Sequence, residues 1–243
     1  MKIATGIVLV GGAGLRLRPN TSDRPKALVE VLGRPMLEWI VRWLRSYDVK
    51  NLVLGVAYKK QKIMDFFGDG RAFDVSIKYS SHSVDGGTAE GIRLAITRFV
   101  SDRVFLVMNG DELSDVNLRK LFEYHIKNKA VSTIVVAPFK SPYGVISLDS
   151  EMNVVRFSEK PVFPLTYVNA GIYVFNRDIL KYIPEEGEIE KTAFPALAKR
   201  RLLKAYLHRG FWRTIDTHKD LIDAERELKK GRFLKIWEAN GTD

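Results

Sequence analysis

Continuous apolar runs and helically spaced apolar residues follow one another along the first half of the chain. Residues 3–10 (IATGIVLV) form an unbroken β-branched run ended by glycines, which is typical of a buried parallel strand. Apolar residues at 36–47 (MLEWIVRWLRSY) recur at helical spacing. Strands are further expected at 51–58, 75–80 and 103–111, and helices at 59–67 and 88–100. This order predicts βαβ units around a parallel sheet.

The second half of the chain is richer in strands. Strands are expected at 132–138, 143–149, 153–161, 167–175 and 203–208, and helices near 176–183, 189–201 and 217–230. Residues 149–153 (DSEMN) are typical of a hairpin connection. We therefore predict an α/β fold, a Rossmann-like doubly wound mixed sheet with an antiparallel extension grown into it. The sequence has no repeat or linker that would divide it, which predicts a single domain over 1–243.

The composition excludes several kinds of chemistry. The 243 residues include no cysteine, which excludes disulfides, thiolate catalysis and cysteine-bound zinc. Gln61 is the only glutamine, and its scarcity beside many charged residues favours a thermophilic source. No secretory signal is recognised, and no apolar run reaches the roughly 20 residues that span a bilayer. A cytoplasmic protein without membrane contact is expected.

The formal net charge of +10 fits a nucleic-acid-binding protein, an enzyme with an anionic substrate, or a charged thermophilic surface. Basic residues interleaved with aromatics, and any known nucleic-acid-binding module, are missing from the sequence. We therefore expect no nucleic-acid partner, and ascribe most of the charge to the surface.

Three glycines follow the first strand, in the stretch 11–19 (GGAGLRLRP). The dinucleotide fingerprint G-x-G-x-x-G fails here because Leu17 occupies the place of the third glycine. The strand at 51–58 also lacks the terminal acidic residue of an NAD site, which disfavours an NAD-dependent oxidoreductase. A Walker A loop is excluded because no G-K-[ST] follows.

Positive charge follows the glycines. Backbone N–H groups of a glycine turn can cradle phosphate oxygens. Arg16 offers a planar fork for a phosphate, and Lys26 offers a compact charge on a backbone stiffened by Pro25. Either residue alone would be an ordinary surface cation, but together with the glycines they indicate a phosphate site.

The stretch GGAGLRLRPNTSDRPKALVEVLGRPML resembles the signature of the sugar-1-phosphate nucleotidylyltransferases, the NDP-sugar pyrophosphorylases. NGD at 109–111, FSEKP at 157–161, YVNAGIYVF at 167–175 and GFWRTIDT at 210–217 follow in that family's order. The resemblance implies the nucleotide-diphospho-sugar transferase type of fold. Residues 1–130 would form the nucleotide-binding core, and residues 131–243 the sugar-binding part, without the C-terminal β-helix domain of some relatives.

The resemblance also implies the reaction. An NTP and a sugar 1-phosphate would give an NDP-sugar and pyrophosphate by in-line attack at the α-phosphorus, with Mg²⁺ as cofactor and a homo-oligomer as a possible assembly. Arg16 and Lys26 would be catalytic and would neutralise the leaving pyrophosphate. The residues that resemble the family's nucleotide contacts are Leu9, Gly11, Gly12, Gly14, Gly87 and Asp111.

Two aspartates are the expected metal ligands. Asp111 ends a predicted parallel strand at the sheet edge where ligands bind, and its hard carboxylate suits Mg²⁺. Many members of the family carry the second aspartate two residues after a tryptophan. Here Thr214 stands at that place, and we assign the second ligand to Asp216, as in the similar cytidylyltransferases. The alternative role for Asp216 is to cap the helix at 217–230.

Sugar contacts are expected in the second half. The residues that resemble the family's sugar-phosphate contacts are Gly144, Glu159, Lys160, Asn169 and Gly171. Lys160 would pair with the phosphate, and Glu159 would accept from hydroxyl groups. His82 and Arg18 receive no role.

The substrate pair stays open. A mannose-1-phosphate guanylyltransferase-like or glucose-1-phosphate thymidylyltransferase-like activity is preferred, and cytidylyltransferase or uridylyltransferase activity is the alternative. A non-catalytic regulatory homologue is the alternative of a different class. The joint presence of Arg16, Lys26, Asp111, Lys160 and Asp216 argues against it.

Overall fold

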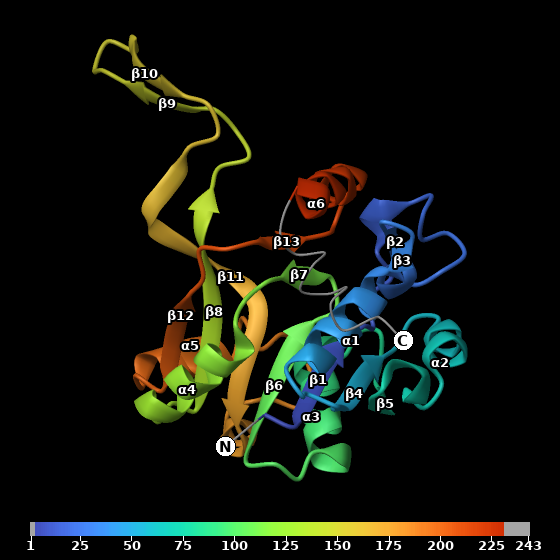
Figure 1. The fold of residues 1–243 in the computed structure, drawn as a ribbon. Coiled ribbons are helices and arrows are strands. Elements are labelled where there is room, and N and C mark those ends of the chain that lie inside the picture. Colours follow the sequence, from blue (N-terminus) through green and yellow to red (C-terminus); the bar gives the residue numbers. More distant parts are fainter. Residues whose placement is uncertain (1–2, 231–243) are drawn as a thin grey trace.

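The computed structural model describes residues 3–230. Its centre is a seven-stranded sheet with the order β12-β8-β11-β6-β1-β4-β5 (Figure 1). The strands are β1 (Thr5–Leu9), β4 (Asn51–Val56), β5 (Ser76–Ser81), β6 (Val104–Asn109), β8 (Ser132–Lys140), β11 (Val162–Asn176) and β12 (Leu203–Leu207). Strands β6, β1, β4 and β5 are parallel, whereas β11 runs antiparallel to both β6 and β8. The predicted mixed sheet is therefore confirmed.

Helices cover both faces of this sheet. Successive residues of β1 point to opposite sides, so Val8 belongs to one hydrophobic core and Ile7 to the other. The helices that contribute to the core of Val8 are α1 (Met36–Ser46), α2 (Lys60–Phe67), α4 (Leu118–Asn128) and α6 (His218–Lys230). The helices on the opposite face are α3 (Gly87–Phe99) and α5 (Ala193–Lys199). This arrangement confirms the doubly wound architecture.

Three short ladders lie outside the main sheet. They are β2 (Glu30–Val31) with β3 (Arg34–Pro35), β7 (Glu112–Ser114) with β13 (Trp212–Thr214), and β9 (Val145–Leu148) with β10 (Val154–Ser158). The antiparallel β9–β10 hairpin and its connections to β8 and β11 project away from the body, and we call residues 141–161 the arm (Figure 1). Of the strands predicted for the antiparallel extension, β8 and β11 belong to the central sheet, and β9 and β10 form the arm.

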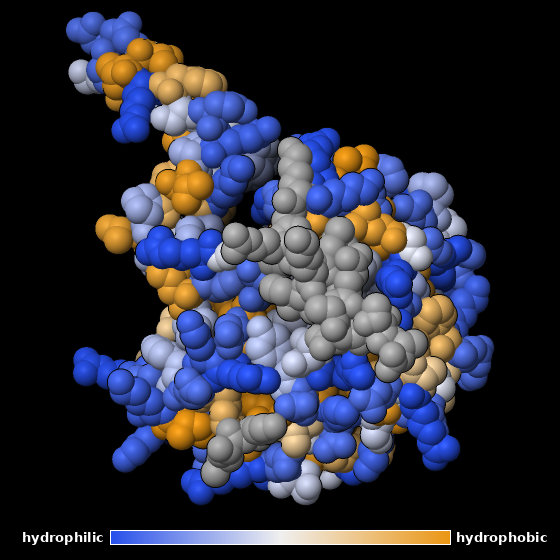
Figure 2. All heavy atoms as spheres, viewed as in Figure 1, coloured by the Kyte–Doolittle hydropathy of each residue, from blue (hydrophilic) through white to orange (hydrophobic). Residues whose placement is uncertain are grey.

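Apolar side chains are exposed along the arm, which Figure 2 shows as the projection at the upper left. Ile146, Leu148, Val155 and Phe157 are all exposed. A two-stranded hairpin without a covering layer is only marginally stable in water. The arm therefore gains little of the burial that stabilises the central sheet.

Three expectations about helices need correction. The segment expected near 176–183 is a 3₁₀ helix (Arg177–Lys181), and that expected at 189–201 is only α5. Helix α4 was missed, although Asn117 caps it by accepting from the Lys120 N–H at 3.0 Å. Its polar outer face hides a narrow apolar stripe that packs on the sheet. None of the helices within residues 3–230 is long and apolar enough to cross a membrane.

Candidate active site

A cavity of about 370 Å³ opens where parallel strands β1 and β6 end. Ligands of open α/β sheets bind at this edge. The sequence-predicted residues that line it are Leu9, Gly11, Gly12, Lys26, Gly87 and Asp111. Gly14 does not line the cavity, although it belongs to the same loop.

Gly14 instead has a structural role in the glycine loop. Its φ of 62° lies in the left-handed region and begins the 3₁₀ helix Leu15–Leu17. A Cβ at this position would lie 2.8 Å from the Cβ of Lys26. Thr21 Oγ1 donates to the Gly14 carbonyl at 2.8 Å, which fixes the loop. The glycine therefore allows the loop to pack closely against the backbone that carries Lys26.

Four charged residues from distant parts of the sequence meet beside the cavity. Lys26 Nζ donates to Asp111 Oδ2 at 2.5 Å and to Asp216 Oδ1 at 2.6 Å. Arg16 pairs with the other oxygen of Asp216 at 2.9 Å. The Lys26 side chain is 11% exposed, whereas that of Arg16 is 71% exposed. The lysine is thus held in place, while the guanidinium can still reach a ligand.

The contacts within the cluster favour the charged forms of Lys26 and Asp216. Burial alone would lower the pKa of Lys26, but the charges and hydrogen bonds of Asp111 and Asp216 outweigh it and raise that pKa. Burial also acts to raise the pKa of Asp216, yet the bond to Lys26 and the nearby Arg16 bring that pKa below its usual value. A buried lysine shared by two carboxylates is therefore a stable ionic arrangement at neutral pH.

The β7–β13 ladder brings Asp216 to Asp111. Trp212 pairs with Ser114 and Thr214 with Glu112, and the Ile215 N–H then donates to the Asp111 carbonyl at 3.0 Å. Asp216 does not cap α6 with its side chain. Thr217 caps the helix instead, together with Asp220: Thr217 Oγ1 accepts from the Asp220 N–H at 3.2 Å, and Asp220 Oδ2 accepts from the Thr217 N–H at 2.8 Å. The Asp216 carboxylate is therefore left for the charged cluster.

The donor set suits a hard cation. Asp111 and Asp216 contact the same ammonium, so their oxygens converge on one point that carries positive charge. Carboxylate oxygens are the protein ligands that Mg²⁺ prefers, and the ion usually keeps water or substrate phosphates as its other ligands. Within residues 3–230 no group of three or more histidine, aspartate or glutamate side chains could hold a metal by itself. The carboxylates of Asp111 and Asp216 would therefore bind a Mg²⁺ ion whose other ligands are phosphate or water oxygens.

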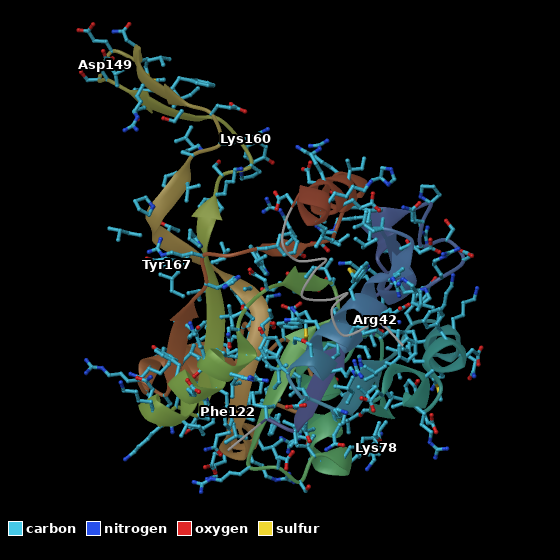
Figure 3. The ribbon with its side chains drawn as sticks, viewed as in Figure 1. Arg42, Lys78, Phe122, Asp149, Lys160 and Tyr167 are labelled. Atoms are coloured by element: carbon cyan, nitrogen blue, oxygen red, sulfur yellow. The ribbon has the colours of Figure 1, made fainter. Side chains whose placement is uncertain are left out.

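The predicted sugar contacts fall into two groups. Asn169 and Gly171 lie on β11 beside the core, where Asn169 Oδ1 accepts from the Gly171 N–H at 3.0 Å. Gly144, Glu159 and Lys160 lie on the arm, and Figure 3 shows Lys160 at its neck, away from the central sheet. Lys160 Nζ and Glu159 Oε1 are 3.7 Å apart and both side chains are largely exposed. Hairpin pairing brings Gly144 to Phe157 and Glu159.

Two acidic residues at the site were missed from the sequence. Glu112 is buried behind Asp111 and Gly171, and burial together with the charge of Asp111 raises its pKa well above the usual value. Glu188 lines the cavity. Glu112 could have been suspected from the sequence because it directly follows Asp111. By contrast, nothing in the acidic stretch 185–190 distinguishes Glu188 from its neighbours.

His82 and Arg18 were left without a role. His82 lines the cavity, and its ring lies so close to Gly11 that a Cβ there would be 2.8 Å from Nε2. Its Nδ1 is 2.8 Å from the Ser83 carbonyl. His82 thus supports the glycine loop from beneath. Arg18 is exposed and is absent from the cavity wall.

Comparisons with known proteins agree on one family. The model of the nucleotidyl transferase family matches residues 5–231. A mannose-1-phosphate guanylyltransferase of Mycobacterium tuberculosis is 34% identical over 93% of this chain and 64% of its own length. The chain thus spans slightly less than two thirds of that relative. A Bacillus subtilis protein described as a glucose-1-phosphate cytidylyltransferase is 29% identical, and 95% of this chain aligns with 99% of it.

A solved structure extends the likeness to three dimensions. A Bacillus anthracis protein described as a glucose-1-phosphate thymidylyltransferase, crystallised with sucrose, superposes with a TM-score of 0.76. The two are 25% identical over 96% of this chain and 98% of that one.

Proposed function

The chain belongs to the sugar-1-phosphate nucleotidylyltransferases of the nucleotidyl transferase family, and we propose that it transfers a nucleotidyl group from an NTP to a sugar 1-phosphate. The observation that carries this proposal is the meeting of Arg16, Lys26, Asp111 and Asp216 beside one cavity. Two cations and two carboxylates at the end of a glycine loop form the charge pattern that a metal-bound triphosphate needs.

The reaction exchanges one phosphate bond for another. An oxygen of the sugar 1-phosphate forms a bond to the α-phosphorus, and the bond from that phosphorus to the β-phosphate oxygen breaks. The products are an NDP-sugar and pyrophosphate. No covalent enzyme intermediate is needed, so the protein contributes by positioning the reactants and stabilising charge.

The charged cluster supplies that stabilisation. Asp111 and Asp216 would hold Mg²⁺, whose charge neutralises the triphosphate when it is bound. With its two carboxylates engaged elsewhere, the Lys26 ammonium becomes available to phosphate oxygens, and its stem stays fixed because it is buried. Arg16, which is mostly exposed, can follow the pyrophosphate as negative charge accumulates on it.

The sugar 1-phosphate would lie between the core and the arm. Gly171 stands beside Asn109 and Glu112 at the core end of this space, and Asn169 accepts from the Gly171 N–H. Lys160 on the arm would pair with the sugar's phosphate and Glu159 would accept from its hydroxyl groups. Movement of the arm towards the body on binding would add Lys160 to the site.

The first candidate pair is GTP with mannose 1-phosphate, by similarity to the mannose-1-phosphate guanylyltransferases. The second is dTTP with glucose 1-phosphate, by similarity to the solved structure from Bacillus anthracis. Cytidylyl and uridylyl transfer are the alternatives within the family.

Pyrophosphate release over a matrix of NTPs and sugar 1-phosphates tests the proposal. Turnover is expected for at least one pair with Mg²⁺, and its loss with a chelator. Absence of turnover for every pair, with nucleotide binding retained, would instead identify a non-catalytic homologue.

A further inference from the structure

We infer that Glu188 selects the base of the nucleotide, and that its carboxylate favours guanine. This inference rests on the proposed function, because it takes the cavity to be the NTP site. Glu188 lies outside every sequence motif described above. It lines the cavity together with Leu9, His82 and the Gly87–Thr88 turn.

The loop that carries Glu188 is tied on both sides to the turn that carries Gly87, which the family resemblance places among the nucleotide contacts. The Gly187 N–H donates to the Gly86 carbonyl at 2.9 Å, and the Ala89 N–H donates to the Gly187 carbonyl at 2.8 Å. Gly87 has a φ of 70°, and a Cβ there would collide with the Gly187 carbonyl. Only glycine at position 87 therefore allows the two loops to approach so closely.

The residues after Glu188 complete the attachment. The Ile189 N–H donates to Thr88 Oγ1 at 3.0 Å, and that hydroxyl donates to Glu190 Oε2 at 2.9 Å. The Ile189 side chain is 1% exposed and is buried in the core beneath α3. Glu188 thus projects from a backbone fixed before and after it. A preorganised acceptor of this kind loses little entropy when it binds a ligand.

One oxygen of Glu188 is available to a ligand. Its Oε2 pairs with Lys191 Nζ at 2.7 Å, and no interaction of Oε1 is found among residues 3–230. The Lys191 side chain is 78% exposed, so this ion pair holds the carboxylate only weakly. Lys26 and Asp111 are the other charged residues of the cavity wall, and both are already engaged in the charged cluster.

The chemistry of a carboxylate decides which base fits. An ionised carboxylate only accepts hydrogen bonds, and it binds best to two donors side by side. Guanine presents its N1–H beside its N2 amino group. Adenine and cytosine each present one amino group next to an acceptor nitrogen, and the N3–H of uracil or thymine lies between two carbonyl oxygens. Guanine therefore matches Glu188 best.

Equilibrium binding of GTP, ITP and UTP by calorimetry, without sugar phosphate, tests this directly. ITP lacks only the N2 amino group. The wild-type protein should bind GTP more tightly, and Glu188→Ala should lower GTP affinity about 5- to 150-fold and abolish the preference over ITP. Lys191→Met breaks the same ion pair but keeps the carboxylate, so its GTP-to-ITP ratio should stay within about twofold of wild type.

Every outcome of this binding experiment either supports or overturns the role of Glu188. Tighter wild-type binding of a pyrimidine nucleotide, or an unchanged GTP-to-ITP ratio in Glu188→Ala, would overturn the role of Glu188. Equal loss in Lys191→Met would assign the effect to the ion pair instead. Because binding needs no turnover, these outcomes are separate from a failure of the pyrophosphate assay, which would overturn the proposed reaction. Thermal unfolding of both variants checks that the exposed substitutions leave the fold intact.

Discussion

Lys26 and Lys160 are both predicted to bind phosphate, but they lie in opposite settings. Lys26 is held by two carboxylates at 2.5 and 2.6 Å, and its side chain is 11% exposed. Lys160 lies on the arm with Glu159 3.7 Å away, and its side chain is 46% exposed. Burial against two carboxylates fixes a charge before the ligand arrives, whereas an exposed pair contributes little until something binds. The cavity is therefore prearranged, and the arm is not.

Replacing the lysine of the cavity should have the largest effect. Lys26→Met removes the ammonium that we propose to contact the reacting phosphates, and we expect pyrophosphate release to fall about 10²- to 10³-fold. The substitution also leaves Asp111 and Asp216 without their shared partner, so its thermal unfolding should be compared with that of wild type. A folded Lys26→Met protein with near-normal turnover would remove Lys26 from the mechanism.

Asp216→Asn tests the metal assignment. The variant keeps the shape of the side chain but removes the charge that a cation needs, and we expect Mg²⁺-dependent turnover to fall by about 10²-fold or more. The measurement is the rate as a function of Mg²⁺ concentration. Asp220→Asn is the matched control, because Asp220 forms the capping pair with Thr217 in the first turn of α6 and contacts neither Lys26 nor Arg16. Similar rates in Asp216→Asn and wild type would contradict the assignment.

Acid should affect the stability contributed by His125 on α4 more than that contributed by the Lys26 cluster. His125 on α4 is buried beside Thr133 Oγ1, at 2.9 Å, and burial lowers its pKa to about 4. The unfolded chain takes up this proton near pH 6.5, whereas the folded chain resists it to about pH 4. The stabilisation is therefore complete above about pH 6.5 and is lost as the pH falls towards 4, with a total of about 3 kcal/mol.

Urea unfolding at neutral pH and at about pH 4.5 measures this effect. His125→Asn should lose less stability than wild type between these two values, because its side chain does not titrate. Equal losses would show that His125 does not carry the acid sensitivity. The Lys26 cluster should contribute little over the same window, since the pKa of Lys26 is raised and that of Asp216 is lowered.

The smallest effect is expected on the arm. Lys160→Met should raise the KM for the sugar 1-phosphate about tenfold and leave the KM for the NTP nearly unchanged. Lys140→Met, another exposed lysine near the base of the arm, is the control. A comparable rise for both substrates would indicate that Lys160 does not distinguish the sugar phosphate, and would weaken the contrast between cavity and arm.

Much of the fold could be predicted because local patterns carry it. The apolar run at 3–10 gave β1, and the helical spacing at 36–47 gave α1 almost to the residue. Helix α4 was missed because its apolar stripe is narrow and its other positions are polar. The 3₁₀ helix at Arg177–Lys181 was taken for a longer helix, since periodicity alone cannot tell the two apart over one turn.

The residues of the candidate site also divide into those predicted from local patterns and those placed by contacts between distant segments. The sequence by itself was enough to predict a phosphate site at the glycine loop, Arg16, Lys26 and Asp111, because the types and spacing of these residues are local properties. The tertiary structure alone showed that Asp111 and Asp216 share the Lys26 ammonium, and that Thr217 with Asp220 caps α6. It also decided that Glu188 lines the cavity and that Lys160 stands apart on the arm. Strand pairing and loop contacts between distant segments set these positions, and no local pattern encodes them.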